Sequence, residues 1–208
     1  MFAAMGAAMN PSPQIDGRIA RSQRTREAVV DALLEILNEG DLQPTAQRIA
    51  QRANVSLRLV FHHFEDLETI YAEVQRRQIE RTAPMLHPAI SSNSPLNKRI
   101  IEMVAQRTRI LEFVSPVRRH AVLRAPFAPT IAKLLAGARE LARDQIAEVF
   151  ERELSAMPAA ERRDVLNALA VAMSWESWEF MRRQQGQSEA DARRVMERTV
   201  RALLAKRS

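Results

Sequence analysis

The sequence predicts an all-α protein, and three features of its composition support this prediction. The strong helix formers Ala, Leu, Arg and Glu are abundant, whereas the 208 residues include only 5 Gly and 10 Pro. Apolar residues recur at helical spacing, and no strand-like alternation is sustained. Hydrophobic residues make up 46% and charged residues 27%, which is typical of a folded chain with a core. We expect a small N-terminal three-helix domain followed by a larger C-terminal helical bundle domain.

The N-terminal end predicts a short tail before the first helix. Residues 1–17 contain Asn10-Pro11-Ser12-Pro13 and lack periodic apolar spacing, so we expect a disordered tail there. The first helix is expected from about Ser22 to Glu39, and Gly40 follows where a left-handed residue would end it. Its apolar face carries Val29, Leu33, Ile36 and Leu37.

Two capping residues in close succession predict a helix-turn-helix. Thr45 can cap a short helix that ends near Ala53, and Asn54 can adopt the left-handed conformation of a turn. Ser56 can then cap a third helix that ends near His63. The predicted helix-turn-helix domain therefore covers 18–65, and a connecting helix over 66–83 begins at the cap Asp66.

Prolines and one glycine divide the rest of the chain. The stretch from Pro84 to Pro95 is a predicted loop and the expected domain boundary, with a C-terminal domain over 84–208. Further helical segments are expected near 95–113, 116–124, 127–156, 159–185 and 188–205, separated by Pro116, Pro126, Pro158 and Gly186.

Composition and motifs exclude several functional classes. The absence of Cys removes disulfides, Cys-based zinc sites, iron–sulfur ligation and thiol nucleophiles. No His-x-x-x-His, Glu-x-x-His, Gly-rich phosphate loop or nucleophile elbow occurs, so we expect no metal, no cofactor and no enzymatic activity. No apolar run is long enough to span a membrane, and no positive segment precedes the first apolar residues, so a cytoplasmic protein is expected.

Positive charge is concentrated at the predicted helix-turn-helix. The net charge is +6 and the pI is about 10.8, which favours a polyanionic partner. No acidic residue occurs from Leu42 to Phe64, a stretch that carries Arg48, Arg52, Arg58, His62 and His63. A basic arm precedes it with Arg18, Arg21, Arg24 and Arg26. Double-stranded DNA is the expected partner, the alternative being an ordinary solvated helix surface.

Residues 24–74 resemble the DNA-binding half of the tetracycline-repressor (TetR) family. Family members place Gly five residues before Thr or Ser, then Ile-Ala, a turn, Ser, and an aromatic-x-His/Tyr-Phe run. This chain has Gly40, Thr45, Ile49-Ala50, Ala53-Asn54-Val55-Ser56 and Phe61-His62-His63-Phe64. Beyond this segment it is similar only to the family's layout of long helices. The resemblance implies a ligand-responsive, dimeric DNA-binding regulator.

The positions of the third helix fit that resemblance. Its exposed side chains would face bases or phosphates in the major groove, whereas Val60 and Phe64 would anchor it to the core. Amides at the start of the helix capped by Thr45 suit a phosphate oxygen, and Arg58 could bind a guanine edge. The expected DNA contacts are Arg24, Thr45, Arg48, Ser56, Leu57, Arg58, Leu59, Phe61 and His62.

Three positions depart from the family pattern. Phe61 stands where the family usually has Tyr, and Leu67 where it usually has Lys, so two phosphate contacts are lost. Arg58 and Leu59 replace residues that are usually small. These departures leave open a second hypothesis: a helical small-molecule-binding or interaction protein with lost or altered operator binding.

Aromatic and Met side chains in the C-terminal half suggest a largely apolar or aromatic effector. They could equally be ordinary core residues, because such stripes at helical spacing are often buried. In the ligand hypothesis a cavity between helices is lined by these side chains together with a few polar ones. The expected effector-binding residues are Met103, Gln106, Phe113, His120, Phe127, Met173, Glu176 and Trp178.

The last two helices leave apolar stripes, which predict either burial in the same chain or a homodimer. The stripes consist of Val165, Leu169 and Ala172, and of Val195, Thr199 and Leu203. In the resembled family this pair forms a four-helix dimer interface, so two recognition helices would reach a pseudo-palindromic operator one DNA turn apart. The family resemblance alone implies a repressor that a small-molecule effector releases from DNA.

Overall fold

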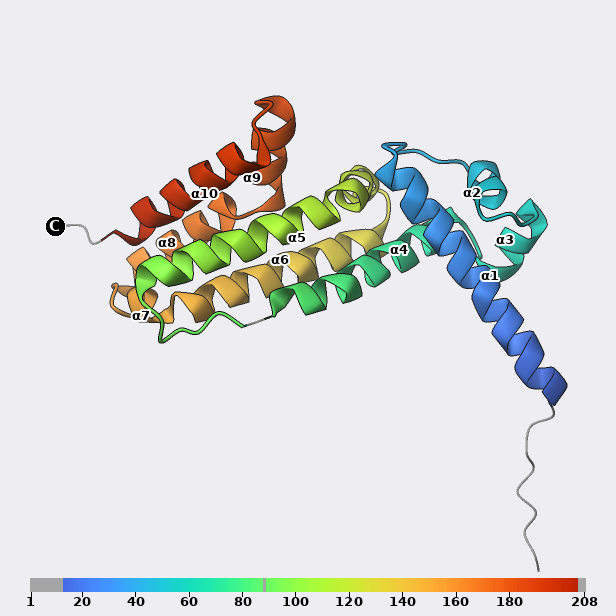
Figure 1. Cartoon of the computed structure of the whole chain (residues 1–208), viewed down its shortest axis with the longest axis horizontal. Helices are drawn as coiled ribbons and strands as arrows, with labels where there is room; N and C mark the ends of the chain where they lie inside the picture. Colours follow the sequence, from blue (N-terminus) through green and yellow to red (C-terminus); the bar gives the residue numbers. More distant parts are fainter. Residues whose placement is uncertain (1–12, 88, 206–208) are drawn as a thin grey trace, which may run out of the picture. The chain divides into compact units, whose positions relative to one another are not determined.

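The computed structural model describes residues 13–87 and 89–205, and Figure 1 shows the fold of this part. All regular elements in it are helices, which confirms the predicted all-α class. The chain divides into two compact units, Met1–Tyr71 and Ala72–Ser208. Across the described ranges, no helix combines the length and apolarity that crossing a bilayer requires.

The N-terminal unit is a helix-turn-helix preceded by a long helix. It contains α1 (Pro13–Asn38), α2 (Ala46–Arg52), α3 (Leu57–His63) and the start of α4 (Leu67–Thr82). The predicted apolar face of α1 is buried and packs on α2 and α3, and the core comprises Val29, Leu33, Ile36, Leu37, Ile49, Val60, Phe64 and Ile70. Gly40 ends α1 with φ of 94°, and the amide of Asp41 donates to the carbonyl of Ile36.

The first helix begins earlier than the sequence predicted. It starts at Pro13 rather than near Ser22, so residues 13–17 of the expected disordered tail are helical. Proline fits the first turn of a helix, because its missing N–H would have no partner there. The remaining part of that tail, residues 1–12, lies outside the described residues.

The two units divide within α4 rather than at the predicted loop around residues 84–95. Ile70 and Tyr71 are buried in the N-terminal unit, and the Tyr71 hydroxyl donates to the carbonyl of Pro44 at 3.1 Å. Gln75 and Gln78 instead bond to α5 of the C-terminal unit. The expected connecting helix therefore contributes to both cores, one after the other.

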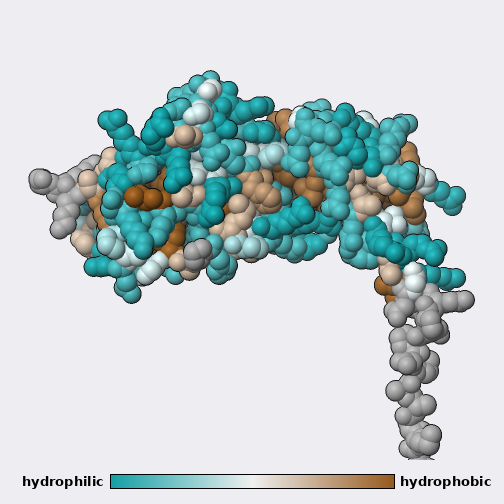
Figure 2. Space-filling model, in the orientation of Figure 1, coloured by the Kyte–Doolittle hydropathy of each residue, from teal (hydrophilic) through white to brown (hydrophobic). Residues whose placement is uncertain are grey.

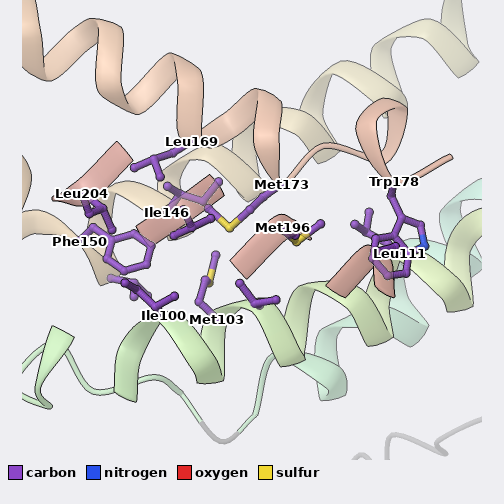
Figure 3. Packing of buried hydrophobic residues seen from close by; sticks show 14 of the residues in the cluster. Ile100, Met103, Leu111, Ile146, Phe150, Leu169, Met173, Trp178, Met196 and Leu204 are labelled. Carbon is purple, nitrogen blue, oxygen red and sulfur yellow. The ribbon is translucent and has the colours of Figure 1, made fainter. Parts of the chain in front are cut away.

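The C-terminal unit is built around the long helix α5 (Leu96–Arg124). It also contains α6 (Pro129–Val149), α7 (Glu151–Ser155), α8 (Ala159–Ala172), α9 (Trp175–Glu179) and α10 (Glu189–Leu204). Figure 3 shows part of the core, in which side chains from these helices interdigitate. Its fully buried members include Met103, Phe150, Leu169, Trp178 and Met196.

Pro116 lies inside α5, so the predicted break between residues 113 and 116 is wrong. A proline in a helix leaves nearby carbonyls without their usual amide donors. Other donors reach this region: the Gln78 amide bonds the carbonyl of Phe113 at 2.9 Å, and the Gln75 amide bonds that of Val117 at 3.2 Å. These contacts from α4 hold α5 on both sides of the proline, and the helix continues through it.

The segments predicted at 127–156 and 159–185 are each divided. Phe150 separates α6 from α7, and Ser174 starts α9 by accepting a hydrogen bond from the amide of Ser177 at 3.1 Å. A π-helix, Phe180–Gln184, continues α9, and the predicted stop Gly186 follows it with φ of 65°. Ser188 caps α10 as predicted, accepting from the amide of Asp191 at 3.1 Å.

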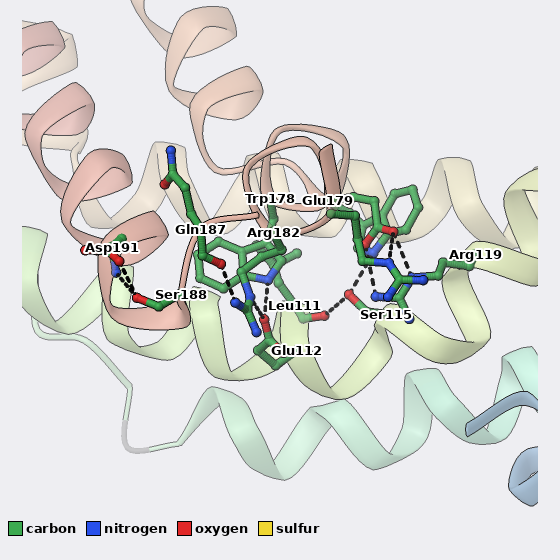
Figure 4. Close-up of polar contacts among 12 residues, drawn as sticks. Leu111, Glu112, Ser115, Arg119, Trp178, Glu179, Arg182, Gln187, Ser188 and Asp191 are labelled. Atoms are coloured by element: carbon green, nitrogen blue, oxygen red, sulfur yellow. Dashed lines mark hydrogen bonds and ion pairs between the residues drawn. The ribbon is translucent and has the colours of Figure 1, made fainter. Parts of the chain in front are cut away.

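A polar network holds this irregular segment on α5 (Figure 4). The Trp178 indole N–H and the Arg182 guanidinium donate to the same Glu112 oxygen, at 2.8 and 2.7 Å. Arg182 also donates to the carbonyl of Gln187 at 2.6 Å, and Arg119 forms an ion pair with Glu179. The π-helix and its turn are therefore fixed by buried or half-buried hydrogen bonds.

Candidate functional site

The outer face of α3 presents both apolar and basic side chains. Val60 and Phe64 are fully buried and anchor the helix. On the opposite side Leu57 is 42% and Phe61 45% exposed. Arg58 and His62 are exposed and Leu59 is half-buried, so the residues expected to contact DNA point away from the core.

Local hydrogen bonds set the start of each short helix. The Thr45 side chain accepts from the amide of Arg48, and the Ser56 side chain accepts from the amide of Leu59, both at 3.2 Å. Asn54 adopts the left-handed conformation at φ of 54°, and the amide of Val55 bonds back to the carbonyl of Ala50. The predicted caps and turn are confirmed, and they fix the orientation of α3 relative to α2.

Ion pairs change the expected charge of the helix-turn-helix. Arg48 lies 2.9 Å from Asp41, and Arg52 binds Glu39 with two hydrogen bonds of 2.7 and 2.8 Å. The bond from Arg52, together with the charges of Arg52 and Arg48, holds the pKa of Glu39 below its ordinary value. The acid-free stretch of sequence thus acquires acidic neighbours from the end of α1 and the following loop.

Two residues of the basic arm, Arg26 and Arg24, have different surroundings. Arg26 donates to the carbonyl of His63 at 2.9 Å, and its guanidinium lies 4.5 Å from the centre of the Phe64 ring, so it fastens the end of α3 to α1. Burial, with the nearby charges of His62 and Arg26, lowers the pKa of His63. Within residues 13–87 and 89–205, Arg24 and Arg58 form no ion pair, and both are exposed.

A large cavity lies within the C-terminal unit. Its volume is about 1150 Å³, and it is lined by residues of α4, α5, α6, α8 and α9. Most of the lining is apolar, and α5 contributes one face of the helix: Arg107, Ile110, Leu111, Val114 and Arg118. The face of the protein shown in Figure 2 is mostly hydrophilic, with smaller patches of hydrophobic residues.

The structure places two of the expected effector residues, Met173 and Glu176, in the lining of this cavity. Met103 and Trp178 belong to the packed core, and His120 and Gln106 are buried outside the lining. Phe113 and Phe127 are exposed by 38% and 78% and do not line the cavity.

Sequence reasoning missed several polar lining residues, including Arg107, Arg118 and Gln145. The spacing of the α5 residues that face the cavity is a regular helical stripe. The predicted break at Pro116 obscured this stripe, because it assigned its two ends to different helices.

The deepest cation of the cavity is Arg107, which is 6% exposed. It donates to the side-chain oxygen of Gln145 at 3.0 Å and to the carbonyl of Ala142 at 3.3 Å. Gln145 in turn donates to Gln106 at 2.6 Å, and Gln106 donates to the carbonyl of Leu86 at 2.9 Å. Burial lowers the pKa of Arg107 to about 10, so the guanidinium remains protonated at neutral pH.

A second group of polar side chains lies at Trp175. The Trp175 indole N–H donates to Ser115 at 3.0 Å, and Arg118 lies 5.8 Å from its ring. Glu176 accepts from Arg139 at 2.9 Å and lies 3.8 Å from Arg118. Burial raises the pKa of Glu176, but the bond from Arg139 and the two arginine charges outweigh it and hold the pKa below its ordinary value.

The fold and these two sites define the class of architecture: a helix-turn-helix unit joined to a helical unit that encloses a cavity. Solved structures of transcriptional regulators have a similar fold. A transcriptional regulator from Rhodococcus sp. Rha1 matches with a TM-score of 0.65 and 15% identity, over 88% of this chain and 95% of that one. A TetR-family transcriptional regulator from Streptomyces coelicolor matches at 0.66 and 18% identity, over 86% and 81%.

A structure of the multidrug binding protein EbrR complexed with imidazole also matches, with a TM-score of 0.56 and 18% identity over 86% of this chain and 94% of that one. No protein-family model matches the chain, and no curated protein matches it in sequence. At these identities the likeness concerns the fold, and the chain has the fold of TetR-family regulators.

Proposed function

We propose that this protein is a sequence-specific DNA-binding transcriptional regulator of the TetR type, acting as a repressor. The outer face of α3 carries the proposal. Arg58 is exposed and unpaired among the described residues, and Leu57, Phe61 and His62 are exposed beside it on a helix that is fixed by a cap and two buried anchors. An exposed cation with apolar neighbours suits base edges and thymine methyl groups in a major groove.

Two basic residues of the helix-turn-helix, Arg48 and Arg52, are paired with acidic side chains, so fewer cations are free to contact DNA than the sequence predicted. Arg48 forms an ion pair with Asp41, so it can bind a phosphate only if this ion pair opens or if its guanidinium bridges Asp41 and the phosphate. Arg52 is held by Glu35 and Glu39 and serves the N-terminal unit itself. We therefore assign base recognition to Arg58 with Leu57, Leu59, Phe61 and His62, and backbone contacts to Arg24, Thr45 and Ser56.

We propose that the protein binds DNA as a homodimer formed through α8 and α10. The stripes predicted for these helices are partly used within one chain, because Leu169 is fully buried and Val165, Ala172 and Leu203 are half-buried. Val171 and Val195 remain 65% and 43% exposed, and Thr199 is also exposed. A two-fold dimer would hold two α3 helices about 34–36 Å apart, one DNA turn.

The cavity of the C-terminal unit supports effector control. Its volume of about 1150 Å³ and its mainly apolar lining suit a small organic molecule. An effector that binds better to a conformation with a different spacing of the two recognition helices would release the operator. EbrR, which has a similar fold, was solved in complex with imidazole, and this supports a ligand role for the unit.

Selection of genomic DNA fragments by the purified full chain tests the DNA-binding proposal. We expect enrichment of an inverted repeat with half-sites about one turn apart. Arg58→Ala should weaken binding to that site by about tenfold or more, whereas Arg109→Ala, which removes an exposed charge from α5, should leave it within about twofold. Only weak binding that disappears with salt would refute the regulator and favour a binding protein without an operator.

Sedimentation analysis tests the dimer separately. Val195→Glu should convert the dimer to a monomer and reduce operator affinity, because a charge would be buried in the interface. Leu123→Glu places the same charge at a 50% exposed position on α5 and should leave the dimer intact. A wild-type chain that is monomeric at concentrations that saturate DNA would refute this interface.

A further inference from the structure

Arg107 is a buried cation without an acidic partner. Its side chain is 6% exposed, yet no carboxylate lies within ion-pair distance of it across the described ranges. Its Nε atom is buried and makes no hydrogen bond, and the other contacts of the guanidinium are with neutral oxygens of Ala142 and Gln145. A buried charge that lacks a counter-charge is costly, so its retention requires an explanation.

Arg99 on the same helix is a buried arginine with a structural role, and its charge is compensated within the fold. Arg99 is 1% exposed and binds both carboxylate oxygens of Glu153, at 2.8 and 2.5 Å. It also donates to the carbonyls of Val149 and Ser94 at 2.6 and 2.9 Å. Arg99 is therefore neutralised and satisfied within the fold, whereas Arg107 is neither.

The neighbours of Arg107 orient it without neutralising it. The Gln145 amide donates its N–H to Gln106, which turns its oxygen toward the guanidinium. Gln106 is held by the carbonyl of Leu86. This chain of amides fixes the cation at the cavity wall. Both hydrogen bonds of the guanidinium come from one terminal nitrogen, Nη2, so Nη1 remains available to a ligand, an arrangement typical of a preorganised binding site.

The depth of the charges decides which ligand the cavity favours. Its lining contains as many acidic residues as arginines, but Glu140, Asp144 and Glu148 are exposed, and Glu176 is paired with Arg139. Solvent screens exposed charges strongly and buried charges weakly. The field inside the cavity is therefore positive, and it is set by two arginines of its lining, the buried Arg107 and the largely buried Arg118.

The wall beside Arg107 is apolar. Ile110, Leu111 and Val114 continue the same face of α5 toward Arg118, about 16 Å further along the helix. Two arginines that far apart cannot share one carboxylate. A ligand whose acidic group binds Arg107 would thus place an apolar body along this stripe.

We propose that the cavity binds an amphipathic organic anion, with its carboxylate paired to Arg107 and its apolar body along Ile110, Leu111 and Val114. The proposal rests on the effector cavity proposed above and specifies the chemistry of its ligand. The carboxylate supplies an acceptor for Nη1, which makes no hydrogen bond in the fold, and the counter-charge that the fold omits. An anion at this site would also raise the pKa of Arg107, which burial lowers.

Paired probes that differ only in charge test this proposal. Hexanoate, octanoate, decanoate and dodecanoate are compared with the primary alcohols of the same length, by calorimetry and by the fluorescence of Trp175, which lines the cavity. The variants are Arg107→Met, which removes the charge at similar length, Arg107→Lys, which keeps it, and Arg109→Met as a control at an exposed position of the same helix.

In the wild type and in Arg109→Met we expect at least one carboxylate to bind about tenfold or more tightly than its alcohol. Arg107→Met should abolish this preference while the alcohol still binds, and Arg107→Lys should retain part of it. Equal binding of acid and alcohol by the wild type would overturn the anion proposal and leave the effector cavity standing. If no probe of either kind bound, both proposals would fail.

Discussion

Replacing Arg99 and Arg107 by methionine, one at a time, compares a buried cation that is paired with a carboxylate and one on the same helix that is not. Arg99→Met removes four hydrogen bonds and leaves Glu153 without its partner in a half-buried position. Breaking a buried ion pair from one side costs about 3–5 kcal/mol. Arg107→Met removes two weaker hydrogen bonds to neutral oxygens, worth about 1 kcal/mol each, and also removes an uncompensated buried charge. We expect its net cost to stay below about 1 kcal/mol.

Thermal unfolding followed by tryptophan fluorescence measures both effects in the C-terminal unit. The only tryptophans are Trp175 and Trp178, and both belong to the C-terminal unit, so their emission reports on that unit. For residues 72–208 the unfolding entropy near the midpoint is about 0.3 kcal/mol/K, so Arg99→Met should lower Tm by about 10–17 °C at fixed protein concentration. Equal destabilisation by the two substitutions would refute the reasoning, since Arg107 would then be as well compensated as Arg99.

Three further predictions concern single side chains. Asn54→Ala should destabilise the N-terminal unit by about 1 kcal/mol and Asn54→Gly should not, because residue 54 has a left-handed backbone with φ of 54°. Amide hydrogen exchange of α3 measures both changes, and equal effects would contradict this argument from the backbone conformation. The pKa of His63 is lower in the folded than in the unfolded chain, so as pH falls the unfolded chain takes up this proton at a higher pH than the folded chain. The N-terminal unit should therefore lose stability below about pH 6.5, and His63→Gln should remove this pH dependence from the same exchange rates. Glu112→Leu leaves the Trp178 indole and Arg182 without their acceptor and should cost about 1–3 kcal/mol in urea unfolding followed by circular dichroism, whereas a cost below about 0.5 kcal/mol would mean that water replaces the carboxylate.

The N-terminal unit could be predicted from its sequence because local rules decide it. Gly40, Thr45, Asn54 and Ser56 each act within a few residues, and the structure has the expected turn, caps and buried faces at these positions. The pairing of Arg52 with Glu35 and Glu39 was missed, because those acids precede the acid-free stretch and reach it only when α1 packs on α2.

The C-terminal unit shows the limit of local rules. Pro116 predicts the end of a helix, but Gln75 and Gln78 supply donors to α5 from a distant part of the chain. The aromatic and Met cluster was compatible with both core packing and a ligand cavity, and the structure divides it: Met103 and Trp178 fill the core, whereas Met173 lines the cavity.

The helical class, the helix-turn-helix and the position of its outward face follow from the amino-acid sequence, because caps, turns and apolar periodicity act over one or two helical turns. Which cations are neutralised and which face a cavity follows from the packing of distant segments. Arg99 and Arg107 lie on one helix and look alike in sequence, but Glu153 reaches the first and only neutral oxygens reach the second. Charge compensation depends on residues far apart in the chain, and folding alone brings them within bonding distance.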